Sequence, residues 1–134
     1  MSEASAFVAK ADQLRVFNPT NPVEMEFFIR EANALLEDMP DVLLSINEKR
    51  YEAERAYSRV KNTAMVEHGK TMIPTFARAQ AELDAADAKR EWDTQKAAYH
   101  YAEDTQKALT TKIYSMLNVN KAIAAAYTVG GGPR

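Results

Sequence analysis

The tripeptide Gly69-Lys70-Thr71 has the residue types that end a phosphate-binding P-loop. The complete motif needs another glycine five residues before Gly69, and that position is occupied by Ala64. It also needs a strand before the loop, whereas the preceding residues have helical spacing. We therefore interpret Gly69 as the left-handed residue that ends a helix.

The two histidines, His68 and His100, do not form a recognisable metal motif. A dinuclear carboxylate bundle needs a glutamate three residues before each histidine, and neither has one. His100 and Asp104 are one helical turn apart, but two ligands are too few for a site. The acid pair Asp84 and Asp87 has no apolar surroundings that would separate two pKa values. We expect solvated side chains here, no catalytic residues, no metal and no cofactor.

Basic side chains offer a better candidate for binding. The chain has a net charge of −2, but residues 1–47 hold 3 basic and 8 acidic residues, whereas residues 105–134 hold 4 basic residues and no acid. This asymmetry favours either head-to-tail self-association or a local polyanion-binding surface. The candidates for contacts with DNA phosphates are Arg55, Arg59, Lys61, Lys70, Lys107 and Lys112. The alternative is that these side chains are merely solvated.

Aromatic residues could act as stacking platforms for exposed bases. Trp92 and Tyr99, however, fall at positions where a helix would pack against a partner, which favours a role in the core. Tyr101, Tyr114 and Tyr127 fit that core less well and could be exposed.

These residues must be positioned by helices. From Thr75, the expected N-cap, to about Tyr127, the pattern predicts one continuous helix of roughly 60–80 Å. Thirteen positions from Ala85 to Tyr127 are alternately three and four residues apart, and ten of them are apolar. The residues expected in a seam between chains are Trp92, Tyr99, Leu109, Ile113 and Met116.

Three shorter elements precede this helix. Residues 1–20 are expected to form either a marginal helix or an arm that docks on another surface. Asn21 is expected to cap a second helix that has Pro22 at its first position. A break is expected at Asp38-Met39-Pro40-Asp41, where Asp38 would cap a third helix that ends at Gly69.

The expected fold is all-α: an elongated, coiled-coil-like antiparallel helical hairpin with an additional N-terminal helix. Its domains would be an arm at 1–20, the hairpin at 21–128 and a flexible tail at 129–134. A second apolar stripe that includes Phe76 and Leu83 gives the long helix more than one apolar face. Because a two-helix hairpin can bury only one of them, a homo-oligomer is predicted.

The chain has no cysteine, no positively charged signal-peptide region and no apolar run that could span a membrane. These features predict a soluble protein of the cytoplasm, with no membrane partner. No small-molecule substrate is expected either.

Several short stretches resemble a family of small phage-encoded helical proteins and, more distantly, the UvsY-type recombination mediators of large tailed phages. The stretches are Glu54-Arg55-Ala56-Tyr57, Gly69-Lys70-Thr71, Ala79-x-Ala81-x-Leu83, Lys107-Ala108-Leu109 and Ile113-Tyr114-Ser115-Met116-Leu117, with Lys121 after them. The resemblance covers roughly residues 45–123. It implies a ring-forming protein that binds single-stranded DNA and helps to load a recombinase in the host cytoplasm. The family's basic residues before the tip would correspond to Arg55, Arg59 and Lys61.

Two functional hypotheses follow. The first is a non-catalytic mediator-like protein whose partners are single-stranded DNA and a recombinase. The second is a structural or interaction protein, such as a phage assembly adaptor or a factor that binds a host protein, without nucleic acid.

Overall fold

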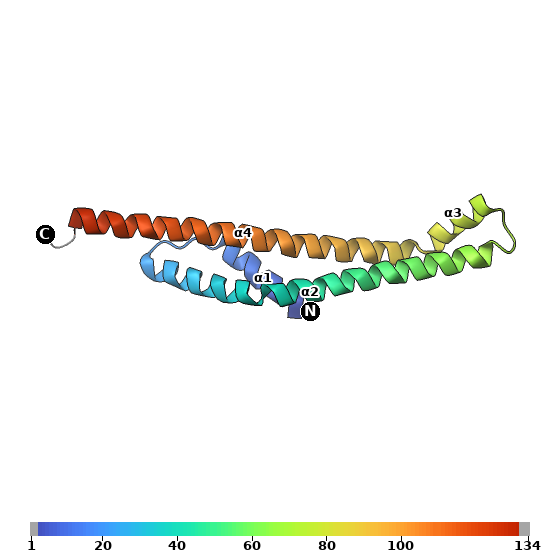
Figure 1. Ribbon diagram of the computed structural model, residues 1–134, viewed down its shortest axis with the longest axis horizontal. Coiled ribbons are helices and arrows are strands. Elements are labelled where there is room, and N and C mark those ends of the chain that lie inside the picture. The colour runs from blue at the N-terminus through green and yellow to red at the C-terminus, as the bar shows by residue number, and fades with distance from the viewer. Residues whose placement is uncertain (1–2, 132–134) are drawn as a thin grey trace. The chain divides into compact units, whose positions relative to one another are not determined.

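The computed structural model describes the backbone of residues 3–131 and the side chains of residues 4–126. Over this range it has four helices: α1 (Glu3–Val16), α2 (Pro22–His68), α3 (Pro74–Asp84) and α4 (Ala86–Gly131) (Figure 1). Helix accounts for 91% of the described residues, and they include no strand. The prediction of an all-α fold is confirmed.

The chain divides into two compact units, to both of which α2 and α4 contribute. The first unit is Met1–Val42 with Ala102–Arg134, and the second is Leu43–Tyr101. The segments expected from the sequence had boundaries at residues 20 and 128, and those boundaries stay predictions. Helix α4 continues through Gly131, so the first residues of the expected tail are helical, whereas 132–134 lie outside the described residues.

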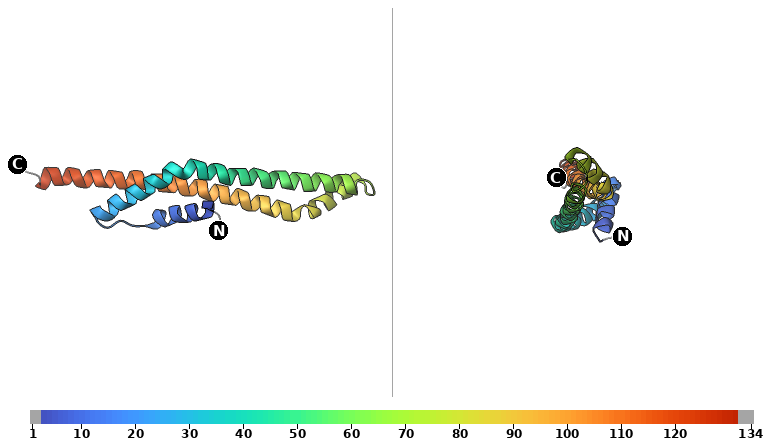
Figure 2. Two further views of the ribbon diagram at one scale, coloured as in Figure 1. Left: turned by 90° about the horizontal axis from the view of Figure 1, so that it is seen from below. Right: turned by 90° about the vertical axis from the view of Figure 1, so that its right-hand side faces the viewer.

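In the first unit, α1 packs beside the first part of α2 and the part of α4 that contains Lys112 (Figures 1 and 2). The segment expected as a marginal helix or docking arm is therefore a helix that buries its own apolar side chains. Phe17, just after α1, stacks on Phe28 with ring centroids 6.4 Å apart. The buried residues of this unit are Ala11, Leu14, Met25, Phe28, Ala32, Leu35, Met39, Ala102, Thr105, Leu109 and Ile113.

Asn21 caps α2 as the sequence predicts. Its Oδ1 accepts a hydrogen bond of 2.9 Å from the Glu24 amide, one of the amides that the helix itself leaves unpaired. The Glu24 carboxylate in turn accepts a hydrogen bond of 3.0 Å from the Thr20 hydroxyl. These two hydrogen bonds, which join Glu24 to Asn21 and to Thr20, fix where α2 begins.

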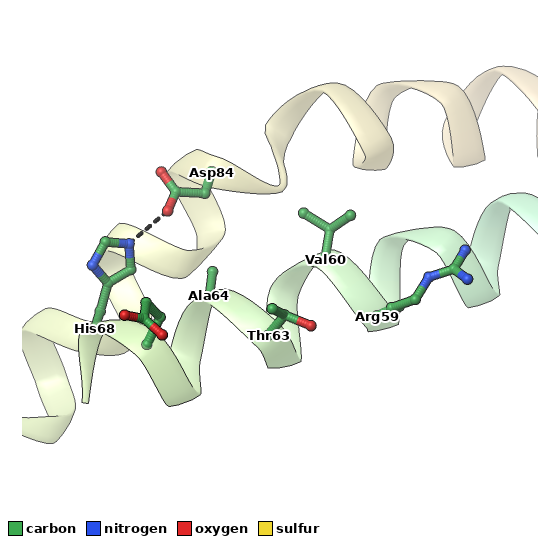
Figure 3. A pocket seen from close by; sticks show the side chains of 7 residues that line it. Arg59, Val60, Thr63, Ala64, His68 and Asp84 are labelled. Atoms are coloured by element: carbon green, nitrogen blue, oxygen red, sulfur yellow. Dashed lines mark hydrogen bonds and ion pairs between the residues drawn. The ribbon is translucent and has the colours of Figure 1, made fainter. Parts of the chain in front are cut away.

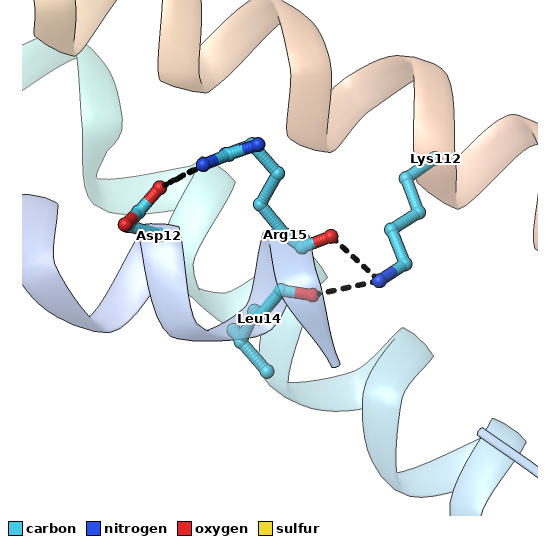
Figure 4. A network of polar contacts seen from close by, with 4 residues as sticks. All are labelled: Asp12, Leu14, Arg15 and Lys112. Carbon is cyan, nitrogen blue, oxygen red and sulfur yellow. Dashed lines mark hydrogen bonds and ion pairs between the residues drawn. The ribbon is translucent and has the colours of Figure 1, made fainter. Parts of the chain in front are cut away.

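Lys112 of α4 caps the C-terminal end of α1. Its Nζ donates hydrogen bonds to the carbonyl oxygens of Leu14 (3.1 Å) and Arg15 (2.7 Å) (Figure 4). It donates a third to the carbonyl oxygen of Phe17. The Leu14 carbonyl also accepts a hydrogen bond of 3.3 Å from the Phe17 amide. The last carbonyls of a helix lack partners within it, and a cation interacts favourably with the negative end of the helix dipole. Burial, with the nearby charge of Arg15, lowers the pKa of Lys112.

In the second unit, the last part of α2 contacts α3 and the start of α4 in opposite chain order. Arg50 lies over the ring of Tyr99, Tyr57 stacks on Trp92, Lys61 pairs with Glu82, and His68 pairs with Asp84. The buried residues Ile46, Ala53, Ala77, Ala81 and Ala85 are mostly alanines, which allow helices to approach closely.

The predicted break at Asp38 to Asp41 is wrong, because α2 runs through Pro40 without interruption. Pro40 lies on the exposed side of the helix, whereas Met39 is completely buried. A proline there removes one backbone hydrogen bond, at a cost of roughly 3 kcal/mol. Burial of apolar side chains on the inner side of the helix can offset this cost. Buried positions follow at intervals of seven residues from Met39, before the proline, to Ile46 and Ala53 beyond it, so the helical phase is unbroken across Pro40.

The predicted continuous helix from Thr75 to Tyr127 is also wrong in one respect, because it is interrupted at Ala85. This residue has φ −94° and ψ 6°, and Figure 1 shows a change of direction between α3 and α4. Its amide still bonds to the Ala81 carbonyl at 2.9 Å, so the interruption is local. The carboxylate of the preceding residue, Asp84, is held from outside the α3–α4 segment by His68 of α2.

Two predicted helix ends need correction. Gly69 follows the last residue of α2, but it does not have the expected left-handed conformation. A Cβ at this position would lie only 2.9 Å from the Met65 carbonyl oxygen, so close approach is the reason for a glycine here. Thr75 is not the cap of the next helix, because α3 begins at Pro74 with Ile73 as its N-cap.

We predict that Lys112→Met destabilises the first unit by about 1.5–3 kcal/mol, the usual contribution of hydrogen bonds to a charged group. Urea denaturation with hydrogen exchange of the α1 amides measures the change. Lys107→Met on the same helix is the matched control, because Lys107 is exposed and forms no ion pair within the described residues. Equal stability of the two variants would contradict this role for Lys112.

Candidate nucleic-acid interface

Two of the six predicted phosphate-binding residues lie together on the outer face of α2. Glu52, Arg55, Ala56 and Arg59 line an open groove with a volume of about 580 Å³. Their spacing of three and four residues places them on one face of the helix, because neighbouring turns bring such side chains next to each other. Arg55 and Arg59 are thus neighbours on this surface.

Both guanidinium groups are available to a ligand. Arg55 and Arg59 are exposed, and neither forms an ion pair or a side-chain hydrogen bond within the described part of the chain. A guanidinium can bind the oxygens of one phosphate through two parallel hydrogen bonds. This face of α2 therefore presents two unpaired phosphate-binding groups one helical turn apart.

A second groove, of about 520 Å³, continues from Arg59 toward the end of α2 (Figure 3). Val60, Thr63 and Ala64 follow Arg59 along α2, and the His68–Asp84 pair lies at the far end (Figure 3). Glu67 also lines this groove. Acidic groups thus lie on both sides of the two arginines: Glu52 in the first groove, and Glu67 and Asp84 in the second.

His68 and Asp84 are paired, whereas the sequence predicted that both would be solvated. His68 Nε2 and Asp84 Oδ2 are 2.6 Å apart, and Gln80 donates a further hydrogen bond of 3.1 Å to Asp84. The hydrogen bonds from His68 and Gln80 lower the pKa of the Asp84 carboxyl. The pair joins the last residues of α2 and α3, which are far apart in sequence.

Lys61, a third predicted phosphate contact, is engaged within the protein. Its Nζ lies 2.7 Å from Glu82 Oε1, and the Tyr57 hydroxyl donates a hydrogen bond of 3.0 Å to Glu82 Oε2. The hydrogen bond with Lys61 and then that with Tyr57 lower the pKa of Glu82, while Glu82 raises the pKa of Lys61. This network could not be predicted from local spacing, because Glu82 lies on a different helix.

The other three candidates differ in their surroundings. Lys70 pairs with Glu67 at 3.1 Å next to the α2–α3 connection. Lys112 is bound to the backbone carbonyls at the end of α1. Lys107 is exposed and forms no ion pair within the described residues. Three of the six cations, Arg55, Arg59 and Lys107, therefore remain unpaired.

Trp92 belongs to a packed cluster of rings and lysines. Its ring stacks on Tyr57 with centroids 5.4 Å apart, and the Nζ atoms of Lys89 and Lys96 lie 4.4 and 4.2 Å from it. Tyr99 is half-buried and carries the Arg50 guanidinium at 4.6 Å. Both rings pack within the second unit but are only half-buried, and their place in a seam between chains stays a prediction.

The other residues of the expected seam differ in burial. Leu109 is completely buried and Ile113 is 5% exposed, both in the core of the first unit of a single chain. They are thus covered without a second copy. Met116 is half-buried, and every residue from Asn118 to Ala126 is exposed. Residues 118–126 of α4 are therefore not covered within the chain.

No group of three or more His, Cys, Asp or Glu side chains in the described part of the chain is placed to hold a metal ion. Among the residues that the structure describes, no helix has both the length and the apolar character that a membrane crossing requires. Comparisons of the chain with models of known protein families, with curated proteins and with solved structures find no match.

We predict that Glu82→Gln lowers the melting temperature at neutral pH and that this difference disappears in acid. The pKa of Glu82 is lowered from 4.5, so its contribution is present above pH 4.5 and is lost as the pH falls through the lowered value. Thermal unfolding of both proteins at several pH values measures the effect. Glu48→Gln is the control, because Glu48 is exposed and unpaired within the described residues. A pH-independent difference would contradict the assignment.

Proposed function

We propose that this protein is a non-catalytic helical protein that binds single-stranded DNA through the outer face of α2. The observation that carries the proposal is the pair of exposed, unpaired guanidinium groups of Arg55 and Arg59 on a shared groove. By the resemblance described above, the family's basic residues before the tip would correspond to Arg55, Arg59 and Lys61, of which Lys61 is paired with Glu82. By that resemblance, the bound protein would assist the loading of a recombinase.

Charge alone does not make either unit a strong DNA binder. The second unit, Leu43–Tyr101, has 10 Lys or Arg and 9 Asp or Glu, a net charge of +1. A few phosphate contacts per chain give weak, salt-sensitive binding. Repetition of the site in an oligomer raises the overall affinity, because each further contact is made at a high effective concentration. The proposal therefore includes assembly of several chains.

The distal part of α4 supports assembly. From Asn118 to Ala126 every residue is exposed, including Val119 (44%) and Ile123 (55%), although the helix continues through Gly131. Helices gain most of their stability from tertiary packing, and a segment without such packing is marginal in water. We propose that copies of the chain, each with its two long helices as an antiparallel hairpin, cover this segment in one another.

A second candidate function is that of an interaction protein without nucleic acid. It is favoured by the exposed apolar residues Phe76 (64%) and Leu83 (70%) of α3. They are seven residues apart and therefore lie on the same side of the helix. A phage or host protein could pack on them, and such binding would not depend on nuclease treatment or on Arg55 and Arg59.

For DNA binding, we predict that Arg55→Gln with Arg59→Gln weakens binding of a labelled single-stranded oligonucleotide. Each lost phosphate contact reduces the slope of log K against log salt by about 0.7, so the double variant should lose about 1.4 per chain. Fluorescence anisotropy at several salt concentrations measures both quantities. Arg78→Gln removes one charge from an arginine that is also exposed and unpaired in the described residues, so it is the charge-matched control for each of the single variants Arg55→Gln and Arg59→Gln.

Two results would contradict the proposed DNA binding. One is the absence of binding by the wild-type protein at about 50 mM salt, where phosphate contacts are strong. The other is an equal loss of affinity in Arg78→Gln, which would indicate a general effect of charge rather than this groove.

For assembly, light scattering should give the wild-type protein a mass that is a multiple of 15.0 kDa. Val119→Ser with Ile123→Ser should shift the mass toward that of one chain, because the two changes remove apolar area from the proposed contact. Val23→Ser is the control, since Val23 is 77% exposed on α2. A wild-type monomer at micromolar concentration would refute assembly.

A further inference from the structure

We propose that Tyr51 is a stacking platform for an unpaired base, next to the phosphate contacts of Arg55 and Arg59. The inference rests on the proposed DNA binding and adds a ligand preference to it. With Tyr51, the outer face of α2 would bind the bases as well as the phosphates of a single strand. The spacing of Tyr51, Arg55 and Arg59 lies within a helix that the sequence predicts, and the structure adds that the Tyr51 ring is exposed.

The three residues form one row on α2. Tyr51, Arg55 and Arg59 are each four residues apart, so their side chains lie one above the other on neighbouring turns, with Cβ atoms roughly 5–6 Å apart. All three are exposed, and 45% of the surface of Tyr51 is accessible. An aromatic ring and two cations therefore follow each other along a single ridge of the helix.

The Tyr51 ring is supported from within the second unit. The guanidinium carbon of Arg50 lies 5.0 Å from the Tyr51 ring and 4.6 Å from the ring of Tyr99. This cation between two rings restricts the motion of the Tyr51 side chain, which lowers the entropy that a ligand would have to remove. The Tyr51 hydroxyl forms no hydrogen bond within the described residues, so no polar contact holds the ring against the protein.

This arrangement suits single-stranded nucleic acid. Phosphate contacts alone do not distinguish a single strand from a duplex, since both expose their phosphates. A base in a single strand can leave its neighbours and stack on an aromatic ring, whereas a base in a duplex is already stacked and paired. Tyr51 would thus supply the preference, and the arginines would supply the salt-sensitive attraction.

The test compares two probes of equal length and charge at low salt: a short oligothymidylate and an abasic oligonucleotide with the same sugar-phosphate backbone. Loss of one stacking contact typically weakens binding roughly 5- to 100-fold. We expect the wild-type protein to prefer oligothymidylate by such a factor. Tyr51→Ala should remove the preference, while Tyr51→Phe should retain it.

Tyr101→Ala is the matched control, because Tyr101 is a similarly exposed tyrosine, at 50%, on α4 of the same unit. It should bind both probes as the wild-type protein does. Circular dichroism of each variant should be unchanged, since the replaced rings are exposed.

The outcomes separate this inference from the proposed function. No binding of either probe by the wild-type protein would overturn the DNA binding itself. Equal binding of both probes would leave the phosphate contacts standing and overturn the stacking role. An equal weakening of both probes by Tyr51→Ala would also overturn it, because Tyr51 would then act only on the position of the arginines.

Discussion

The stack of Tyr57 on Trp92 determines which side of α2 faces solvent in the second unit. The rings lie 5.4 Å apart, and the Tyr57 hydroxyl is bound to Glu82, so this side of the helix is fixed against α3 and α4. Residues two positions away in a helix point to nearly the opposite side. With Tyr57 inward, Arg55 and Arg59 point outward. The proposed DNA contacts thus depend on a packing interaction that involves no DNA-binding residue.

The cations of this protein have two different roles. Lys61 and Lys112 hold helices together, one through a carboxylate of α3 and the other through the carbonyls at the end of α1. Arg55 and Arg59 have no such partners in the described residues. The chemistry of each side chain suits its role, since an ammonium can donate to several carbonyls around one point, whereas a guanidinium matches a phosphate. A count of basic residues cannot make this distinction.

The sequence predicted the features that depend on local spacing. The all-helical fold and the Asn21 cap follow from residue types within a few positions of each other, and the structure has both. It did not predict the passage of α2 through Pro40, because that depends on the burial of Met39. Nor did it predict the interruption at Ala85, where neither proline nor glycine is present. The sequence could not predict the pairing of cations across helices either, because that pairing depends on where the fold places Glu82 and the α1 carbonyls.

The most direct test of the outward face of α2 is an NMR titration of the isotope-labelled protein with a single-stranded oligonucleotide at low salt, with the arginine Nε–Hε resonances as the signal. If this face binds the strand, the resonances of Arg55 and Arg59 shift with the amount of bound oligonucleotide, whereas that of Arg78 stays in place. Unchanged Arg55 and Arg59 resonances in a sample that binds the oligonucleotide would contradict binding by this face.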